Sequence, residues 1–121
     1  MTGKQILIVE DEKPIRDMIA FGLRRAGFTV SEAEDCSEAR SRIADSRPDL
    51  MLVDWRMPDL DGISTLRALR ERLGDGMPPA ILITAFNEPV IWEQARQVRC
   101  DAVLVKPITA SALQDTLAHL L

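Results

Sequence analysis

Polar and charged side chains stand at the ends of several apolar runs in this sequence. The acidic triplet Glu10-Asp11-Glu12 follows one run, and Asp54 ends another. Thr84 and Lys106 close two further runs. Carboxylates that share a site with a hydroxyl and an ammonium group can hold a divalent cation and a phosphoryl group, because the positive charges offset the negative ones. These residue types point to phosphoryl chemistry if the fold brings them together.

Five short β-rich segments alternate with five segments of helical periodicity. The β-rich segments are residues 5–10, 29–33, 50–54, 80–84 and 102–105. The first, third and fourth are almost continuously apolar, which is typical of strands buried on both faces of a parallel sheet. We therefore predict an α/β fold with a doubly wound, five-stranded parallel sheet and helices on both faces.

The helical segments carry their own start and stop signals. Apolar residues recur every four positions from Ile15 to Leu23, and Gly27 is suited to end that helix. Pro89 suits the first turn of the fourth helix, and Thr109 is a good N-cap for the last. In doubly wound sheets ligands bind beyond the carboxyl ends of the strands, which is where the polar residues would lie.

Length and charge exclude several classes of protein. The chain has 121 residues, which fits one domain spanning residues 1–121. Its net charge is −4, and the basic residues form no stripe, so we expect no direct contact with nucleic acid. Arg67, Arg70 and Arg72 are interpreted as a solvated helix face.

The sequence also indicates the compartment. No apolar run is long enough to span a membrane, and the N-terminus lacks the layout of a signal peptide. Cys36 and Cys100 are far apart and have no neighbouring histidine, so a disulfide or zinc site is not expected. We therefore expect a cytoplasmic protein with no membrane partner.

The acids could share one cation site. Three carboxylates at one edge of a sheet repel one another unless a cation lies among them, and a site of oxygen ligands suits Mg²⁺. Asp54 could act as a nucleophile and form an aspartyl phosphate, while Glu10 and Asp11 hold the metal. Thr84 would add a hydroxyl donor and Lys106 a positive charge. Taken singly, each acid could instead simply cap a helix.

Four motifs in order along the chain resemble those of the response-regulator receiver family. They are residues 6–12 (ILIVEDE), residues 54–62 (DWRMPDLDG), Thr84-Ala85 and Lys106-Pro107. The resemblance covers the whole chain and implies a (βα)5 flavodoxin-like fold with strand order 2-1-3-4-5. It also implies a phosphorylation-activated switch in a two-component phosphorelay.

The resemblance implies a role for each motif residue. Asp54 would be the phosphoacceptor, and a sensor histidine kinase or phosphotransfer protein would be the donor. The Mg²⁺ ligands would be Glu10, Asp11, Asp54 and the backbone carbonyl of Arg56. The phosphoryl pocket would be formed by Thr84, Ala85 and Lys106, with a cis peptide bond before Pro107. The domain would catalyse only its own phosphorylation and dephosphorylation.

One position departs from the family pattern. Val103 stands where the family usually has a tyrosine or phenylalanine that acts with the threonine as a switch. A β-branched side chain has little rotamer freedom. We therefore expect the coupling between Thr84 and Val103 to differ from the coupling between the threonine and the aromatic residue that is usual in the family. The output face would still be the fourth helix, fifth strand and fifth helix, and would act on an unidentified effector. The last helix has no Lys or Arg, so we expect a monomer or weak dimer.

Two other functions are compatible with parts of the pattern. The chain could be a degenerate receiver that only binds other proteins. It could also be a small Mg²⁺-dependent phosphatase with an aspartyl nucleophile, although such enzymes usually carry a second aspartate where Arg56 stands. A flavin site is disfavoured because the acidic loop at residues 10–12 has the wrong charge for a phosphate.

Overall fold

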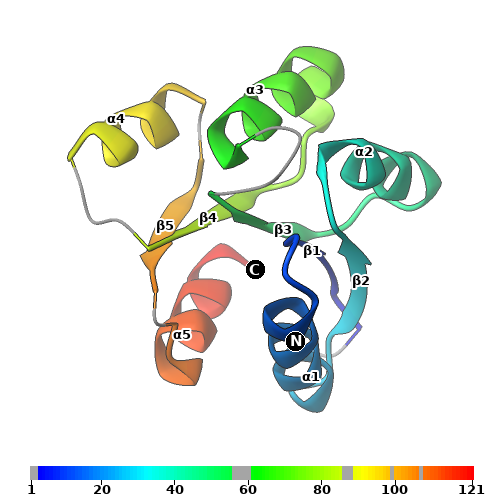
Figure 1. Ribbon diagram of the computed structural model, residues 1–121. Helices are drawn as coiled ribbons and strands as arrows, with labels where there is room; N and C mark the ends of the chain where they lie inside the picture. Colours follow the sequence, from blue (N-terminus) through cyan, green and yellow to red (C-terminus); the bar gives the residue numbers. More distant parts are fainter. Residues whose placement is uncertain (1–2, 56–60, 86–88, 99, 107) are drawn as a thin grey trace.

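A five-stranded parallel sheet lies between two layers of helices in the computed structural model (Figure 1). The structure describes residues 3–55, 61–85, 89–98, 100–106 and 108–121. The strands are β1 (Gln5–Val9), β2 (Thr29–Ala33), β3 (Leu50–Asp54), β4 (Ala80–Thr84) and β5 (Ala102–Val105). The helices are α1 (Lys13–Arg25), α2 (Cys36–Asp45), α3 (Gly62–Leu73), α4 (Pro89–Gln97), α5 (Ala110–Leu120) and the short 3-10 helix η1 (Gly74–Gly76). The strand order β2-β1-β3-β4-β5 is the expected one.

Each face of the sheet has its own hydrophobic core. Alternate residues of the central strands, such as Leu7 and Val53, pack with α2, α3 and α4. Their neighbours, such as Ile8 and Leu52, pack with α1 and α5 (Figure 1). Strands β3 and β4 are buried along their full length, which confirms the prediction from their continuous apolar runs.

The predicted helix boundaries agree with the structure wherever it describes them. Helix α1 ends at Arg25, and Gly27 follows with a φ of 99°, a left-handed conformation that glycine adopts at little cost. Pro89 is the first residue of α4. The backbone N–H of Ala112 donates to Thr109 Oγ1 at 3.0 Å, so Thr109 caps α5.

The first strand is one residue shorter than predicted. It ends at Val9, and Glu10 is the first residue of the following loop. The N–H of Glu10 still donates to the carbonyl of Ala33 at 3.0 Å, but its own carbonyl accepts a hydrogen bond from Arg16. None of the helices in the described part of the chain is long and apolar enough to cross a membrane.

Candidate metal and phosphoryl site

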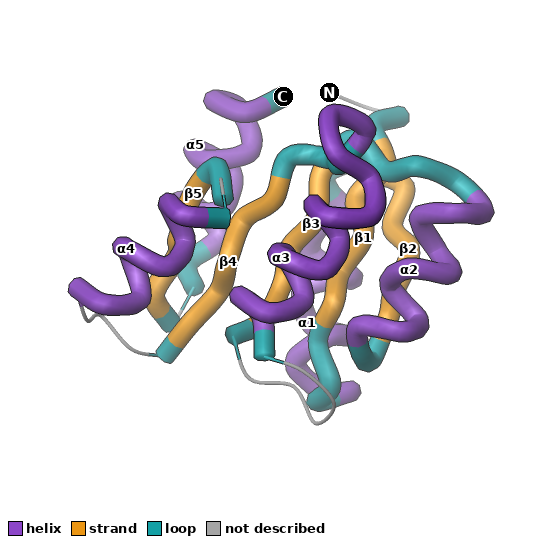
Figure 2. The backbone as a smooth tube through the Cα atoms, turned by 90° about the horizontal axis from the view of Figure 1, so that it is seen from above, coloured by secondary structure: helices purple, strands orange, loops and turns teal. Residues whose placement is uncertain are grey.

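The strands that carry the candidate residues lie side by side in the sheet (Figure 2), and each pairs with its neighbour in parallel. Their carboxyl ends therefore lie along one edge. Glu10 follows β1, Asp54 ends β3, Thr84 ends β4 and Lys106 follows β5. The β4–β5 register sets Thr84 opposite Val105, and the N–H of Lys106 donates to the carbonyl of Thr84 at 2.7 Å. The sheet thus brings together residues up to 96 positions apart, from Glu10 to Lys106.

Three carboxylates meet at this edge. One carboxylate oxygen from each of Glu10, Asp11 and Asp54 lies within 4.8 Å of the other two. Glu10 and Asp54 are only 3 % and 6 % exposed, whereas Asp11 is exposed. Glu10 Oε2 is buried and has no hydrogen-bond partner among the described residues. A buried acceptor without a partner, in a group of carboxylate oxygens, fits an oxygen-ligated cation such as Mg²⁺.

Lys106 reaches into the same group. Its Nζ lies 2.9 Å from Asp54 Oδ1 and 3.7 Å from Glu10 Oε1. Partial burial works against the charged ammonium, but the hydrogen bond and charge of Asp54, together with the charge of Glu10, outweigh it and raise the pKa of Lys106. The ammonium is therefore a stable positive charge beside the carboxylate that would accept the phosphoryl group.

The Glu10 carboxyl group is strongly perturbed. Burial, followed by the charge of Asp54, raises the pKa of Glu10 from an ordinary value of 4.5 to about 8, even though Lys106 acts in the opposite direction. Without a metal ion, Glu10 is therefore largely protonated at neutral pH. Binding of a divalent cation would favour the ionised form and release this proton.

The stability of the metal-free protein is expected to fall as the pH rises from about 5 to about 8. Folded Glu10 keeps its proton over a range in which the unfolded chain has lost it, so its contribution is complete below 4.5 and is lost as the pH passes about 8. The expected loss is on the order of a few kcal/mol. Urea unfolding at a series of pH values, with a chelator present, would measure this loss. In Glu10→Gln the free energy of unfolding should depend less on pH over the same range. An equally steep curve in that variant would assign the effect to another group.

The remaining predicted residues are placed as follows. Thr84 is fully buried at the end of β4, and Ala85 is exposed directly after it. Val103 is half-buried on β5 and packs against the core beneath α4. Arg56 and Pro107 lie outside the described residues, so the predicted carbonyl ligand and cis peptide bond stay predictions.

Gly62 allows α3 to start directly beside the end of β3, where Asp54 lies. A Cβ atom at this position would lie 2.5 Å from the carbonyl oxygen of Asp54 and 2.7 Å from Leu82 Cδ1. Its N–H donates to the carbonyl of Trp55 at 2.7 Å, and Asp61 caps the helix by accepting from the N–H of Ser64 at 2.7 Å. The close approach of this helix to Asp54 is visible only in the structure.

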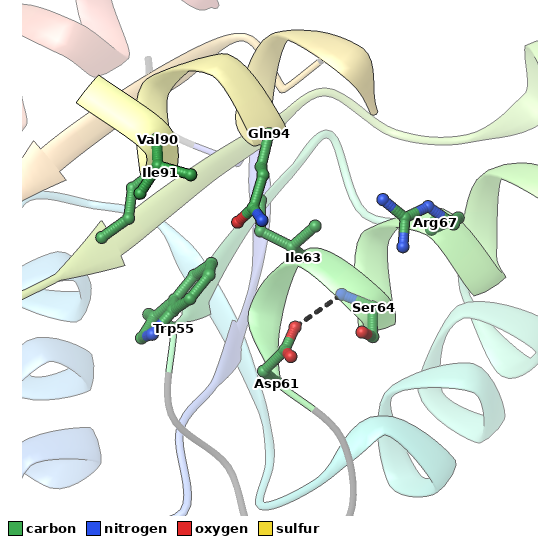
Figure 3. Close-up of a pocket in the computed structure, with 8 residues that line it drawn as sticks. All are labelled: Trp55, Asp61, Ile63, Ser64, Arg67, Val90, Ile91 and Gln94. Atoms are coloured by element: carbon green, nitrogen blue, oxygen red, sulfur yellow. Dashed lines mark hydrogen bonds between the residues drawn. The ribbon is translucent and has the colours of Figure 1, made fainter. Parts of the chain in front are cut away.

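Trp55 links the site to α4. It follows Asp54 directly and packs partly buried against the core on the α3 and α4 side. A cavity of about 400 Å³ separates α3 from α4, and Trp55 lines it with Ile63 of α3 and Ile91 and Gln94 of α4 (Figure 3). The indole is therefore well placed to report changes at Asp54 or in α4 through its fluorescence.

Comparison with known protein sequences finds relatives along most of the chain. Residues 6–118 match the response regulator receiver domain family. The chain is 41 % identical over 113 residues to the phosphate regulon transcriptional regulatory protein PhoB of Pseudomonas aeruginosa, covering 93 % of this chain and 49 % of that protein. It is 32 % identical over 107 residues to the alkaline phosphatase synthesis transcriptional regulatory protein PhoP of Bacillus subtilis, covering 88 % of this chain and 44 % of that protein. The chain thus spans about half the length of these curated relatives.

Solved structures have the same fold. The chemotaxis protein CheY4 of Vibrio cholerae has a TM-score of 0.92 and 28 % identity, covering 99 % of this chain and 100 % of that one. The receiver domain of the Francisella response regulator 1452 has a TM-score of 0.89 and 28 % identity, covering 98 % and 96 %. Together with the family match over residues 6–118, these similarities establish that the chain belongs to the response regulator receiver domain family.

Proposed function

We propose that this domain is a signalling switch that accepts a phosphoryl group on Asp54 in a Mg²⁺-dependent reaction. The observation that carries the proposal is the grouping of the Glu10, Asp11 and Asp54 carboxylates within 4.8 Å, with Lys106 Nζ 2.9 Å from Asp54. A nucleophilic carboxylate, an oxygen-rich cation site and a fixed ammonium are the parts that phosphoryl transfer requires.

In the proposed reaction, an Asp54 carboxylate oxygen attacks the phosphorus of a phosphohistidine on the donor protein. A P–O bond forms, the P–N bond breaks, and the imidazole, which carries a proton on its other ring nitrogen, leaves as a neutral group with the bonding electron pair. Mg²⁺, held by Glu10, Asp11, Asp54 and the backbone carbonyl of Arg56, would offset the charge on the phosphoryl oxygens. Lys106 pairs with a phosphoryl oxygen, and the Thr84 hydroxyl donates a hydrogen bond to another. Later attack by water on the phosphorus breaks the P–O bond to Asp54, releases inorganic phosphate and restores the carboxylate.

The donor in this proposal is a sensor histidine kinase or a phosphotransfer protein, as for receiver domains in general. The output would be a change in the surface of α4, β5 and α5, passed to an effector. The phosphoryl group adds charge and acceptor oxygens at Asp54, and it can shift a conformational equilibrium only through contacts that differ between the two states. We expect α4 and the loop before it to carry most of the difference, because Val103 offers no aromatic ring to reorient.

Incubation with acetyl phosphate is expected to add one phosphoryl group per chain when Mg²⁺ is present and none when it is chelated. The dependence follows because the phosphoryl oxygens would meet three acidic side chains, and Lys106, which pairs with Asp54, offsets only part of the resulting negative charge. Intact mass spectrometry would measure the adduct. Absence of the adduct, together with no effect of Mg²⁺ on Trp55 fluorescence, would instead favour a degenerate receiver that acts through protein binding alone.

A further inference from the structure

Arg16 joins α1 to the loop that carries the predicted metal ligands. Its Nη1 donates to the backbone carbonyl of Glu10 at 2.7 Å, and its Nε pairs with Glu32 Oε1 of β2 at 3.3 Å. The side chain is only 13 % exposed. A guanidinium group is a rigid planar fork, so two bonds on different nitrogens fix its orientation well.

The bond to Glu10 acts on both neighbouring carboxylates. The carbonyl of Glu10 belongs to the peptide group that joins Glu10 to Asp11, and this group is planar. Holding the carbonyl oxygen therefore sets the plane that also positions the Cα of Asp11. The N–H of Glu10 is held in turn by the carbonyl of Ala33 at 3.0 Å. The backbone that presents Glu10 and Asp11 is thus restrained from two sides.

We propose that Arg16 is a positioning residue for Mg²⁺: it fixes the peptide plane between Glu10 and Asp11, and Glu32 compensates its charge. This inference rests on the proposed Mg²⁺ site. Residues that orient metal ligands typically change metal affinity about 10- to 100-fold when they are removed. We therefore expect Arg16→Ala to raise the Kd for Mg²⁺ at least about tenfold while leaving the maximal phosphorylation rate largely unchanged at saturating Mg²⁺.

Arg24 supplies a matched control on the same helix. Its Nη2 donates to Glu32 Oε2 at 3.3 Å and to the carbonyl of Val30 at 3.2 Å. None of the hydrogen bonds described for Arg24 reaches Glu10 or Asp11. Arg24→Ala thus removes an arginine that also contacts Glu32, but leaves the Glu10–Asp11 peptide restrained.

The test uses the Trp92→Phe variant as parent, because the sequence has two tryptophans and this change leaves Trp55 as the only one. Fluorescence titration with MgCl₂ would give the Kd for the parent, Arg16→Ala, Arg24→Ala and Arg16→Lys. The Kd should rise in Arg16→Ala and stay near the parent value in Arg24→Ala. Arg16→Lys should not restore affinity, because one ammonium cannot reproduce the guanidinium fork. The rate of labelling by acetyl phosphate would then be measured at increasing Mg²⁺ concentrations. This gives two separate values for each variant, the half-saturating Mg²⁺ concentration and the maximal rate.

Equal Kd values for Arg16→Ala and Arg24→Ala would overturn the inference while leaving the proposed function intact. Full recovery in Arg16→Lys would also overturn it, since charge alone would then explain the affinity. If Arg16→Ala fails to fold, Arg16→Lys is compared with Arg24→Lys instead. The Kd for Mg²⁺ should then rise in Arg16→Lys and stay near the parent value in Arg24→Lys, and equal values would overturn the inference. A parent protein that shows no response to Mg²⁺ would overturn the proposed function together with this inference.

Discussion

Replacement of Asp54 by asparagine is expected to abolish the phosphoryl adduct while leaving the fold intact. Asparagine has nearly the same shape and can still accept a hydrogen bond from Lys106, which lies 2.9 Å from Asp54 Oδ1, but an amide oxygen is a poor nucleophile. Intact mass after treatment with acetyl phosphate and Mg²⁺ should match that of the untreated protein. Circular dichroism would verify the fold.

The same variant should weaken the pH dependence of stability. The charge of Asp54 is the second cause, after burial, of the raised pKa of Glu10, so this pKa should fall below about 8 without returning to 4.5. The decline in stability between pH 5 and pH 8 should then become smaller. A persistent adduct in Asp54→Asn would show that another residue accepts the phosphoryl group. An unchanged pH dependence of stability would show that the charge of Asp54 does not contribute to the raised pKa of Glu10.

Replacement of Gly62 by alanine is expected to destabilise the protein by about 1–3 kcal/mol, towards the upper end of that range. Two of the three atoms nearest to the new methyl group are backbone, the carbonyl oxygen of Asp54 at 2.5 Å and the Cα of Trp55 at 3.0 Å, and neither can move without disturbing β3. The midpoint of urea unfolding would measure the change. The rate of phosphorylation should also fall, because the clash falls on Asp54, the proposed phosphoacceptor.

Gly22→Ala is the matched control for this substitution. Gly22 lies inside α1, and a Cβ atom there would meet nothing within 4 Å among the described residues. Alanine in a helix interior is more stable than glycine by about 0.5–1 kcal/mol, so this variant should gain stability. If both variants shifted the urea midpoint in the same direction by the same amount, close packing at Gly62 would not explain the stability change in Gly62→Ala.

The layered fold could be predicted because burial leaves a direct pattern in the sequence. The continuously apolar runs at residues 50–54 and 80–84 are both buried over their full length. The strand order came from the resemblance to receiver domains, since periodicity does not say which strands are neighbours. The end of β1 was predicted one residue too late. Glu10 is buried and its N–H still donates to Ala33 of β2, but its carbonyl bonds to Arg16 instead of a strand, and the sequence pattern does not show this change.

Contacts made by long side chains were much harder to predict. Arg70 was interpreted as part of a solvated face, which was wrong: its Nε donates to the carbonyl of Val98 at 2.9 Å and joins α3 to the end of α4. Composition shows that an arginine can lie at the surface, but not which distant carbonyl it reaches. Arg16 was missed for the same reason. The pairing of Lys106 with Asp54 was easier to anticipate, because Asp54 ends β3 and Lys106 follows β5 at the same edge of one sheet.

The anchoring of the Asp54–Trp55 backbone has a consequence for the entropy of the reaction. The N–H of Trp55 donates to the carbonyl of Ile83 at 2.8 Å, its carbonyl accepts from Gly62 at 2.7 Å, and Gly62 packs against Asp54 itself. The backbone of Asp54, the proposed nucleophile, is therefore already ordered in the resting protein. Little conformational freedom has to be lost when the donor arrives, so even a small phosphodonor that makes few contacts of its own should find the carboxylate preorganised for attack.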